Sequence, residues 1–139
     1  MDKKGFTLVE ILAVIALIGV VSLLIIPNIV KTFNDTTDKT MKVQEKEVSE
    51  AGLLYLEDFC KNPINGNRCP SSFTRSSDYK YSGTVSLSTL ISNKYIEEVT
   101  LNEKECNGCV VFTDNKAEAY LICGDAGNPD YKSDSYRCN

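Results

Sequence analysis

Residues 1–30 read MDKKGFTLVEILAVIALIGVVSLLIIPNIV, and this stretch decides the fold. An apolar run extends from Phe6 to Ile26 and is interrupted only by Thr7, Glu10, Gly19 and Ser22. As an α-helix, these 21 residues would reach about 31 Å, which is close to the thickness of the hydrocarbon core of a bilayer. The pattern therefore predicts a helix that spans a membrane.

Glu10 is the one carboxylate inside this run, and its presence needs a physical explanation. A carboxylate in hydrocarbon costs about 2.5–3.5 kcal/mol on insertion scales. Either Glu10 lies near the interface and extends its carboxylate to water, or it pairs with a cation in an assembly. The residues that precede it favour the second interpretation.

Residues 3–10, KKGFTLVE, resemble the cleavage and methylation signature of type IV prepilins and of their pseudopilin relatives. The likeness rests on a basic leader, on Gly5 before the cut and Phe6 after it, on Glu10, and on the long apolar helix that follows. The motif covers about the first quarter of the chain. A secretory signal peptide fits less well, because the run exceeds the usual apolar core of about 7–15 residues and no Ala-x-Ala-like site follows it.

The resemblance implies that a membrane prepilin peptidase removes residues 1–5 and methylates the new amine of Phe6. The methylated amine keeps its positive charge, so Glu10 of a neighbouring subunit would pair with it during assembly. Lys3 and Lys4 would hold the leader in the cytoplasm, so that the rest of the chain faces outward. The implied partners are identical or related pilin subunits, membrane lipid before assembly, an assembly platform and a cytoplasmic ATPase.

Residues 27–60 are expected to continue the helix with an amphipathic pattern. Members of one helix face recur at three- or four-residue spacing, namely Val30, Phe33, Thr37, Met41, Gln44, Val48, Ala51, Tyr55 and Phe59. This face would be widened against a sheet by Val43, Leu53, Leu54 and Leu56. We expect a nearly continuous helix from Phe6 to about Cys60 that ends at Asn62-Pro63, because proline disfavours helix at the residue before it.

Gly19 and Pro27 are expected to weaken this helix. Pro27 removes one backbone hydrogen bond, which predicts either a simple break or a kink that bends the head over its neighbours. Gly19 and Pro27 also match positions that, in some members of the prepilin family, bound a segment losing helicity on assembly. Glycine and proline both lower the cost of such melting.

Residues 61–139 are expected to form a small globular head. Residues 61–84 are rich in Asn, Ser, Gly and Pro and predict a surface loop, and residues 86–96 predict a short helix capped by Ser86 or Ser88. Two β-rich runs around residues 114–116 predict a hairpin with a two-residue loop at Asn115-Lys116, which would place Cys123 opposite Gly108. The predicted fold class is α+β, with a long N-terminal helix packed on a small antiparallel sheet whose loops are stapled by disulfides.

The six cysteines have two interpretations. A zinc site would use Cys106, Cys109, Cys123 and Cys138, but the paired Cys-x-x-Cys of a zinc ribbon is missing. An even number of cysteines in a small exported head favours disulfides. We expect Cys60 to bond Cys69, with either Cys106 or Cys109 bonded to Cys123 and the other bonded to Cys138.

Other chemistry has little support in the sequence. Four tail residues offer oxygen atoms to a cation, and some secretion pseudopilins bind calcium in a comparable region: Asp125, Asn128, Asp130 and Asp134. No calcium-loop spacing of about 12 residues is present, so we expect a solvated turn there. The chain has no histidine, which removes Ser-His and Cys-His dyads, and its net charge of −4 argues against a nucleic-acid site. We expect no catalytic residue, metal or cofactor.

The sequence therefore predicts a structural subunit that is cleaved, N-methylated and polymerised into an extracellular pilus. Before assembly it would reside in the cell membrane with its N-terminus in the cytoplasm and residues 61–139 outside. Residues 6–26 would become the filament core, and residues 27–60 would connect that core to the head. The alternatives are a pseudopilin of a type II secretion or competence system, and a single-span anchored binding domain that does not polymerise.

Overall fold

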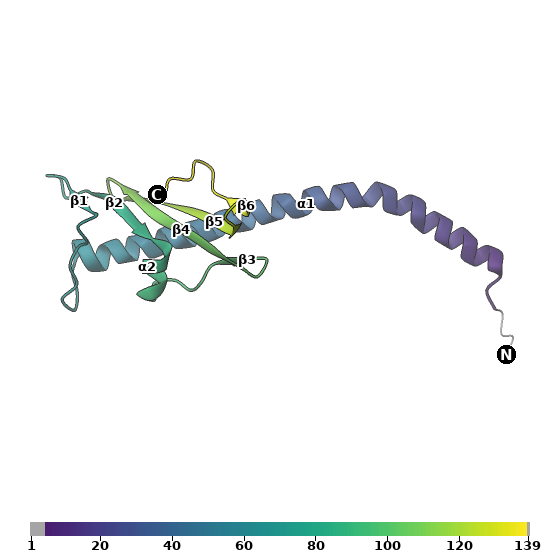
Figure 1. The fold of residues 1–139 in the computed structure, drawn as a ribbon, viewed down its shortest axis with the longest axis horizontal. Coiled ribbons are helices and arrows are strands. Elements are labelled where there is room, and N and C mark those ends of the chain that lie inside the picture. Colours follow the sequence, from purple (N-terminus) through teal and green to yellow (C-terminus); the bar gives the residue numbers. More distant parts are fainter. Residues whose placement is uncertain (1–4, 139) are drawn as a thin grey trace. The chain divides into compact units, whose positions relative to one another are not determined.

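The computed structural model describes residues 5–138, apart from the side chains of residues 24–28 and 30. The chain divides into two units, Met1–Lys39 and Thr40–Asn139. The helix α1 (Leu8–Leu56) crosses the boundary between them and passes directly into a π-helical turn, η1 (Glu57–Lys61) (Figure 1). The helical run begins at Leu8 instead of Phe6, and it stops immediately before Asn62-Pro63 as proline chemistry requires.

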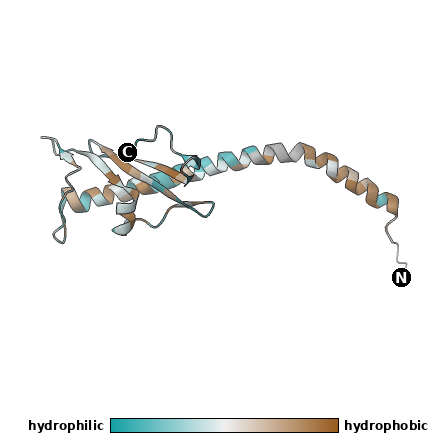
Figure 2. Cartoon of the chain, viewed as in Figure 1, coloured by the Kyte–Doolittle hydropathy of each residue, from teal (hydrophilic) through white to brown (hydrophobic). Residues whose placement is uncertain are grey.

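The first unit is a helix whose apolar side chains are uncovered. Phe6 is 82% exposed and Leu23 is 76% exposed, and the large apolar residues between them are all exposed. These apolar residues follow one another closely along the chain, so they point to all sides of the helix. Figure 2 shows this part of α1 as almost uniformly hydrophobic. No described residue of the unit buries this surface.

Among the described residues, no helix is both long enough and apolar enough to cross a membrane. The membrane-spanning segment predicted for residues 6–26 is therefore not confirmed. Its last three positions, residues 24–26, lie outside the described side chains.

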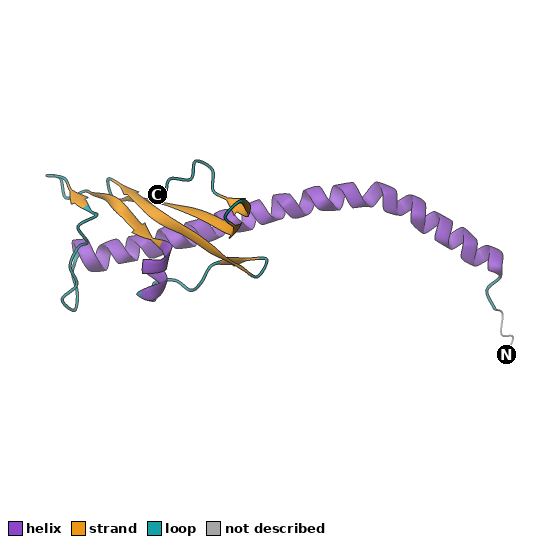
Figure 3. Ribbon diagram, in the orientation of Figure 1, coloured by secondary structure: helices purple, strands orange, loops and turns teal. Residues whose placement is uncertain are grey.

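The second unit contains an antiparallel sheet in the order β1-β2-β4-β5-β6, with β3 paired to the start of β4 (Figure 3). The strands are β1 (Thr74–Arg75), β2 (Tyr81–Ser86), β3 (Thr100–Leu101), β4 (Lys104–Thr113), β5 (Lys116–Asp125) and β6 (Asn128–Lys132). A short helix, α2 (Leu87–Ser92), follows β2, and its N-cap is Ser86, whose hydroxyl accepts from the N–H of Thr89. The α+β class predicted from the sequence is thus present.

The C-terminal part of α1 packs across this sheet. The buried helix residues are Met41, Val48, Ala51, Gly52, Tyr55 and Leu56. Gly52 permits the close approach, because a Cβ added there would lie 2.9 Å from Cγ1 of Val110 on β4. At the edge of the sheet, the hydroxyl of Tyr131 donates a 2.8 Å hydrogen bond to the carboxylate of Glu45, which fixes the helix against β6.

The prediction that Val43, Leu53 and Leu54 widen this buried face is wrong. Val43 and Leu54 are each 59% exposed, and Leu53 is exposed as well. At about 100° per residue, these side chains project from the flank or the far side of the helix when Met41 and Val48 face the sheet. Of the residues expected to widen the face, Leu56 is the one that enters the core.

The hairpin between β4 and β5 has a different loop from the predicted one. Its two loop residues are Asp114 and Asn115, with φ of 52° and 69°, and Thr113 pairs with Lys116. Two-residue hairpin loops of this type need positive φ at both central positions, which Asp and Asn adopt more readily than Lys. The register therefore shifts, and Cys123 lies opposite Cys106 instead of Gly108.

Two predicted loops contain strands. Residues 61–84 were expected to be a loop, yet they include β1 and most of β2, and the turn-rich tail includes β6. In β2, Tyr81 and Val85 are buried on one face, but the intervening Ser, Gly and Thr conceal this alternation in the sequence. The predicted helix at 86–96 ends earlier, at Ser92.

Three disulfides hold the second unit together. Cys60–Cys69 closes the loop after η1, Cys106–Cys123 joins facing positions of β4 and β5, and Cys109–Cys138 pins the C-terminal tail to β4. Of the two alternatives left open for Cys123, the structure contains the pair with Cys106. All six cysteines are bonded, so none offers a thiolate to zinc.

Candidate processing and assembly site

The Gly5–Phe6 peptide bond lies ahead of α1, outside regular secondary structure. Gly5 is exposed, and a Cβ added to it would meet no atom within 4 Å. The first helical hydrogen bond described here runs from the N–H of Ile11 to the carbonyl of Thr7 at 3.2 Å. The backbone at the predicted cleavage point is therefore open to a second molecule.

Thr7 and Glu10 form a capping box at the start of α1. The N–H of Glu10 donates to the Thr7 hydroxyl oxygen at 3.3 Å, and the Glu10 carboxylate accepts from the backbone N–H of Thr7 at 3.1 Å. The Thr7 hydroxyl also donates to the same carboxylate oxygen at 3.2 Å. These bonds satisfy N–H groups that a helix start leaves without intrahelical partners.

This box gives Glu10 partners within its own chain, which the sequence interpretation missed. The signal was present, because Thr7-Leu-Val-Glu10 has the Thr-x-x-Glu spacing of a capping box. Both residues lie on the C-terminal side of the Gly5–Phe6 bond, so cleavage there would leave the box intact. The carboxylate also lies at the end of the helix where the macrodipole favours negative charge.

A new amine at Phe6 would place a positive charge near the N-terminus of α1, and the Glu10 carboxylate can compensate it. A cation at a helix N-terminus opposes the macrodipole. From Gly5 to Asn34 the sequence contains one acidic residue, Glu10, and one basic residue, Lys31. Glu10 is thus the carboxylate available in this stretch to compensate the charge that processing would create.

The two positions predicted to weaken the helix, Gly19 and Pro27, both lie within the continuous helix α1, and the weakening itself stays a prediction. Gly19 lies within α1, and a Cβ added there would meet nothing within 4 Å. Close to it, the Ser22 hydroxyl donates to the carbonyl of Ile18 at 2.7 Å, a back-bond often seen where helices bend. Pro27 lies outside the described side chains, so a kink at that position stays a prediction.

Two of the three acidic tail residues, Asp125 and Asp130, are engaged by a lysine. The Nζ of Lys104 lies 3.1 Å from the carboxylate of Asp125 and 3.3 Å from that of Asp130. The hydrogen bonds to Asp125 and Asp130 raise the pKa of Lys104. Within the described residues, no group of three or more His, Cys, Asp or Glu side chains could hold a metal ion.

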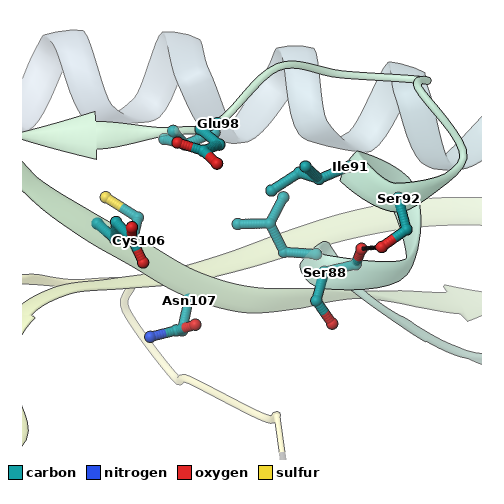
Figure 4. Close-up of a pocket in the computed structure, with 9 residues that line it drawn as sticks. Ser88, Ile91, Ser92, Glu98, Cys106 and Asn107 are labelled. Carbon is teal, nitrogen blue, oxygen red and sulfur yellow. Dashed lines mark hydrogen bonds between the residues drawn. The ribbon is translucent and has the colours of Figure 1, made fainter.

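A cavity of about 220 Å³ lies between α2 and the start of β4 (Figure 4). Its lining includes Ser88, Ile91, Ser92, Glu98, Cys106 and Asn107. The Ser92 hydroxyl donates to the carbonyl of Ser88 at 2.8 Å, and Cys106 is in a disulfide. The cavity therefore pairs no serine or thiol nucleophile with a basic side chain.

Residues 1–26 match the family model described as the prokaryotic N-terminal methylation motif. The chain carries a type IV prepilin-type cleavage and methylation motif. This prepilin motif includes Gly5, Phe6, Thr7 and Glu10, and so contains the whole capping box. No curated protein and no solved structure matches the chain.

Proposed function

We propose that the chain is a type IV pilin-like structural subunit that is cleaved after Gly5, methylated on Phe6 and polymerised into an extracellular pilus. The observation that carries this proposal is the prepilin motif at residues 1–26, joined to a helix whose apolar side chains are exposed on all sides. An uncovered apolar helix of this kind requires lipid or other helices around it.

Assembly would bury this surface between subunits. Burial of apolar surface is worth about 25 cal/mol per Å² relative to water. Moving the helix from lipid into a bundle of like helices changes its apolar environment little, so subunits could be stored in the membrane and extracted by an ATP-driven machine. Residues 1–5 would be the leader, and the prepilin peptidase, the assembly platform and the ATPase would be partners.

The charge of Glu10 would set the position of each new subunit. The capping box holds the Glu10 carboxylate at the first turn of α1. In a bundle, the methylated amine of a neighbouring Phe6 could reach this carboxylate, and pairing would offset the cost of burying both charges. The same steps would serve a pilus or the shorter pseudopilus of a type II secretion or competence system.

The mass of the mature protein tests processing. We expect an intact mass that begins at Phe6, with one added methyl group and the loss of hydrogens for three disulfides. Fragmentation should place the methyl group on the Phe6 amine. A protein that retains residues 1–5 when the peptidase is present would overturn the proposal.

Substitution of Glu10 tests assembly against the alternative of an anchored domain that never polymerises. Glu10→Leu should abolish filaments in sheared surface fractions seen by electron microscopy, while membrane levels of the protein stay normal. Glu47→Leu is the matched control, because Glu47 is an exposed carboxylate further along α1. If Glu10→Leu filaments equal those of the wild type, Glu10 has no role in assembly.

A further inference from the structure

Segment 61–80 gives one end of the second unit a basic surface. It contains the exposed residues Lys61, Arg68, Arg75 and Lys80, against a single acidic residue, Asp78. We call these four residues the basic end. They stand out in a chain whose net charge is −4.

Most of this charge is unpaired. In the described part of the chain, Arg68, Arg75 and Lys80 form no ion pair, and Lys61 has one exposed partner, Glu57, at 3.7 Å. The guanidinium of Arg75 lies 5.0 Å from the ring centre of Tyr79, whose side chain is 70% exposed. The basic end is thus available to an acidic surface on another molecule.

A second group of charges, which we call the acidic end, surrounds the start of β4 and the turn between β5 and β6. Its members are all exposed: Glu97, Glu98, Glu103, Glu105, Asp125 and Asp130. Lys104 lies among them and engages Asp125 and Asp130. The four glutamates form no ion pair among the described residues, so their charge is not neutralised within the chain.

The two groups lie at opposite ends of the sheet (Figure 1). Strand β4 begins at Lys104, within the acidic end, and finishes at Thr113 beside the Asp114-Asn115 loop. That loop is joined to the start of β2, since Tyr81 and Asn115 exchange hydrogen bonds of 2.8 and 3.0 Å. Ten strand residues span roughly 30 Å, so the two ends are well separated in one subunit.

The basic end is also anchored where α1 finishes. The Tyr81 hydroxyl donates a 2.9 Å hydrogen bond to the carbonyl of Cys60, which places Lys61 beside the start of β2. The Cys60–Cys69 disulfide holds Arg68 near the same point. Glu98 lies at the other end of β4. The carbonyl of Val99, the next residue in the chain, accepts a 2.8 Å hydrogen bond from the N–H of Cys106. Glu98 and Cys106 also line the same cavity (Figure 4).

We propose that the basic end of one copy docks on the acidic end of the next copy, in a head-to-tail contact between second units. A two-fold dimer through either end would bring like charges together, so the complementary contact is heterologous and repeats along an open chain. The inference rests on the proposed polymerisation of the chain and names the contact between heads. Exposed ion pairs are individually weak, so this contact orients heads that the apolar helices hold together.

A polyanion is a less suitable occupant of the basic end. Nucleic-acid surfaces usually carry a basic stripe on a basic domain, and this chain is acidic overall. The six carboxylates of the acidic end would repel a long polyanion. They would attract the basic end of a second copy, whose charge is opposite.

The first test detects the contact directly in full-length processed protein. Unlabelled and ¹⁵N-labelled copies are mixed, assembled into filaments or kept in detergent, and treated with a carbodiimide that joins lysines to carboxylates. Cross-links between peptides of different label should join Lys61 or Lys80 to the glutamates of the acidic end. Exposed Lys132 lies outside the basic end and is the control. Absence of mixed-label links between the two ends would overturn the proposal.

The second test reverses the charges. Arg68→Glu/Arg75→Glu makes both ends acidic and keeps Lys61 and Lys80 for cross-linking. Glu97→Lys/Glu103→Lys/Glu105→Lys makes both ends basic. Each variant alone should lower the yield of mixed-label links about tenfold, because like charges now meet. An equimolar mixture of the two should recover links between different variants only. All five positions are exposed, and an intact mass with three disulfides verifies the fold of each variant.

The outcomes separate this inference from the proposed function. If the wild-type protein forms filaments and neither charge reversal lowers the yield of mixed-label links, the proposed polymerisation is retained. The head-to-tail contact is then overturned. End-to-end links in detergent without filaments would support the contact and count against polymerisation. If reversal of the basic end spares the links but abolishes binding of a labelled single-stranded oligonucleotide, that end serves a polyanion and the proposal is wrong.

Discussion

The carboxylate of Glu10 accepts hydrogen bonds from the backbone N–H and the hydroxyl of Thr7, at 3.1 and 3.2 Å. The segment that carries the prepilin motif therefore also carries its own helix cap. Capping and charge are two separate properties of Glu10, and substitutions can distinguish them.

Thr7→Val removes the capping hydroxyl and keeps the shape of the side chain. Loss of an N-cap costs about 0.5–2 kcal/mol, so amide exchange at Glu10, whose N–H donates to Thr7, should speed up by about 2- to 30-fold. Glu10→Gln keeps a residue suited to the capping box but removes the charge. Its amide exchange should stay near that of the wild type while filaments are lost. If Thr7→Val prevents assembly as fully as Glu10→Gln, the charge of Glu10 alone does not explain its role in assembly.

Gly52→Ala should destabilise the second unit. The new Cβ would lie 2.9 Å from Cγ1 of Val110 and 3.2 Å from Cζ of Phe112, both in the core. Overpacking costs about 1–3 kcal/mol, which exceeds the gain of up to about 1 kcal/mol from replacing a helical glycine. The urea midpoint of the head, followed by near-ultraviolet circular dichroism, should fall.

Gly19→Ala is the matched control, because Gly19 is also helical but has open space around it. Its urea midpoint should stay at or above the wild-type value. An equal loss of stability in both variants would mean that the Gly52 contact with β4 is not the cause.

The stability of the loop between β4 and β5 should depend on Asn115. Its φ is 69°, and its side-chain oxygen accepts from the N–H of Tyr81 at 2.8 Å. Asn115→Gly and Asn115→Ala both remove this hydrogen bond. Only the alanine variant is also destabilised, by about 1–2 kcal/mol, because alanine is strained in the left-handed backbone conformation. Unfolding of the alanine variant should therefore need less free energy than that of the glycine variant by about that amount. Equal stabilities would argue against a strained loop.

The parts of the fold that sequence predicted well have strong local signals. The helix follows from an almost continuous apolar run and a long three- and four-residue repeat, and Pro63 marks its end. The motif that contains Gly5, Phe6 and Glu10 is confirmed at residues 1–26, and the processing of these residues stays a prediction. Thr7 has an equally local signal in its Thr-x-x-Glu spacing, which is typical of a capping box.

The missed features depend on tertiary context. Strand β2 has only Tyr81 and Val85 to mark its buried face, and its pairing with β4 across many intervening residues stabilises it. The hairpin register depends on whether Asp114 or Lys116 occupies a left-handed position, which hydrophobic periodicity does not report. Exposure of Val43 and Leu54 likewise depends on the angle at which the helix meets the sheet.

Tyr95 should make the stability of the second unit depend on pH above 10. Its hydroxyl donates a 2.8 Å hydrogen bond to the carboxylate of Asp58, and its ring packs edge-on against Tyr55. Burial, followed by the hydrogen bond and the charge of Asp58, raises the pKa of Tyr95 from 10.0 to about 12. Because the folded pKa exceeds the unfolded one, this contribution to stability is complete below pH 10 and is lost as the pH rises towards 12.

Tyr95→Phe should therefore make the fall of the urea midpoint above pH 10 shallower. It should not abolish the fall, because Tyr55, Tyr120 and Tyr131 also have raised pKa values. Asp58→Asn keeps a hydrogen-bond acceptor but removes the charge, so ultraviolet titration should show a lower Tyr95 pKa that still exceeds 10, since burial remains. An unchanged pH slope in Tyr95→Phe would show that Tyr95 ionises as freely in the folded protein as in the unfolded chain.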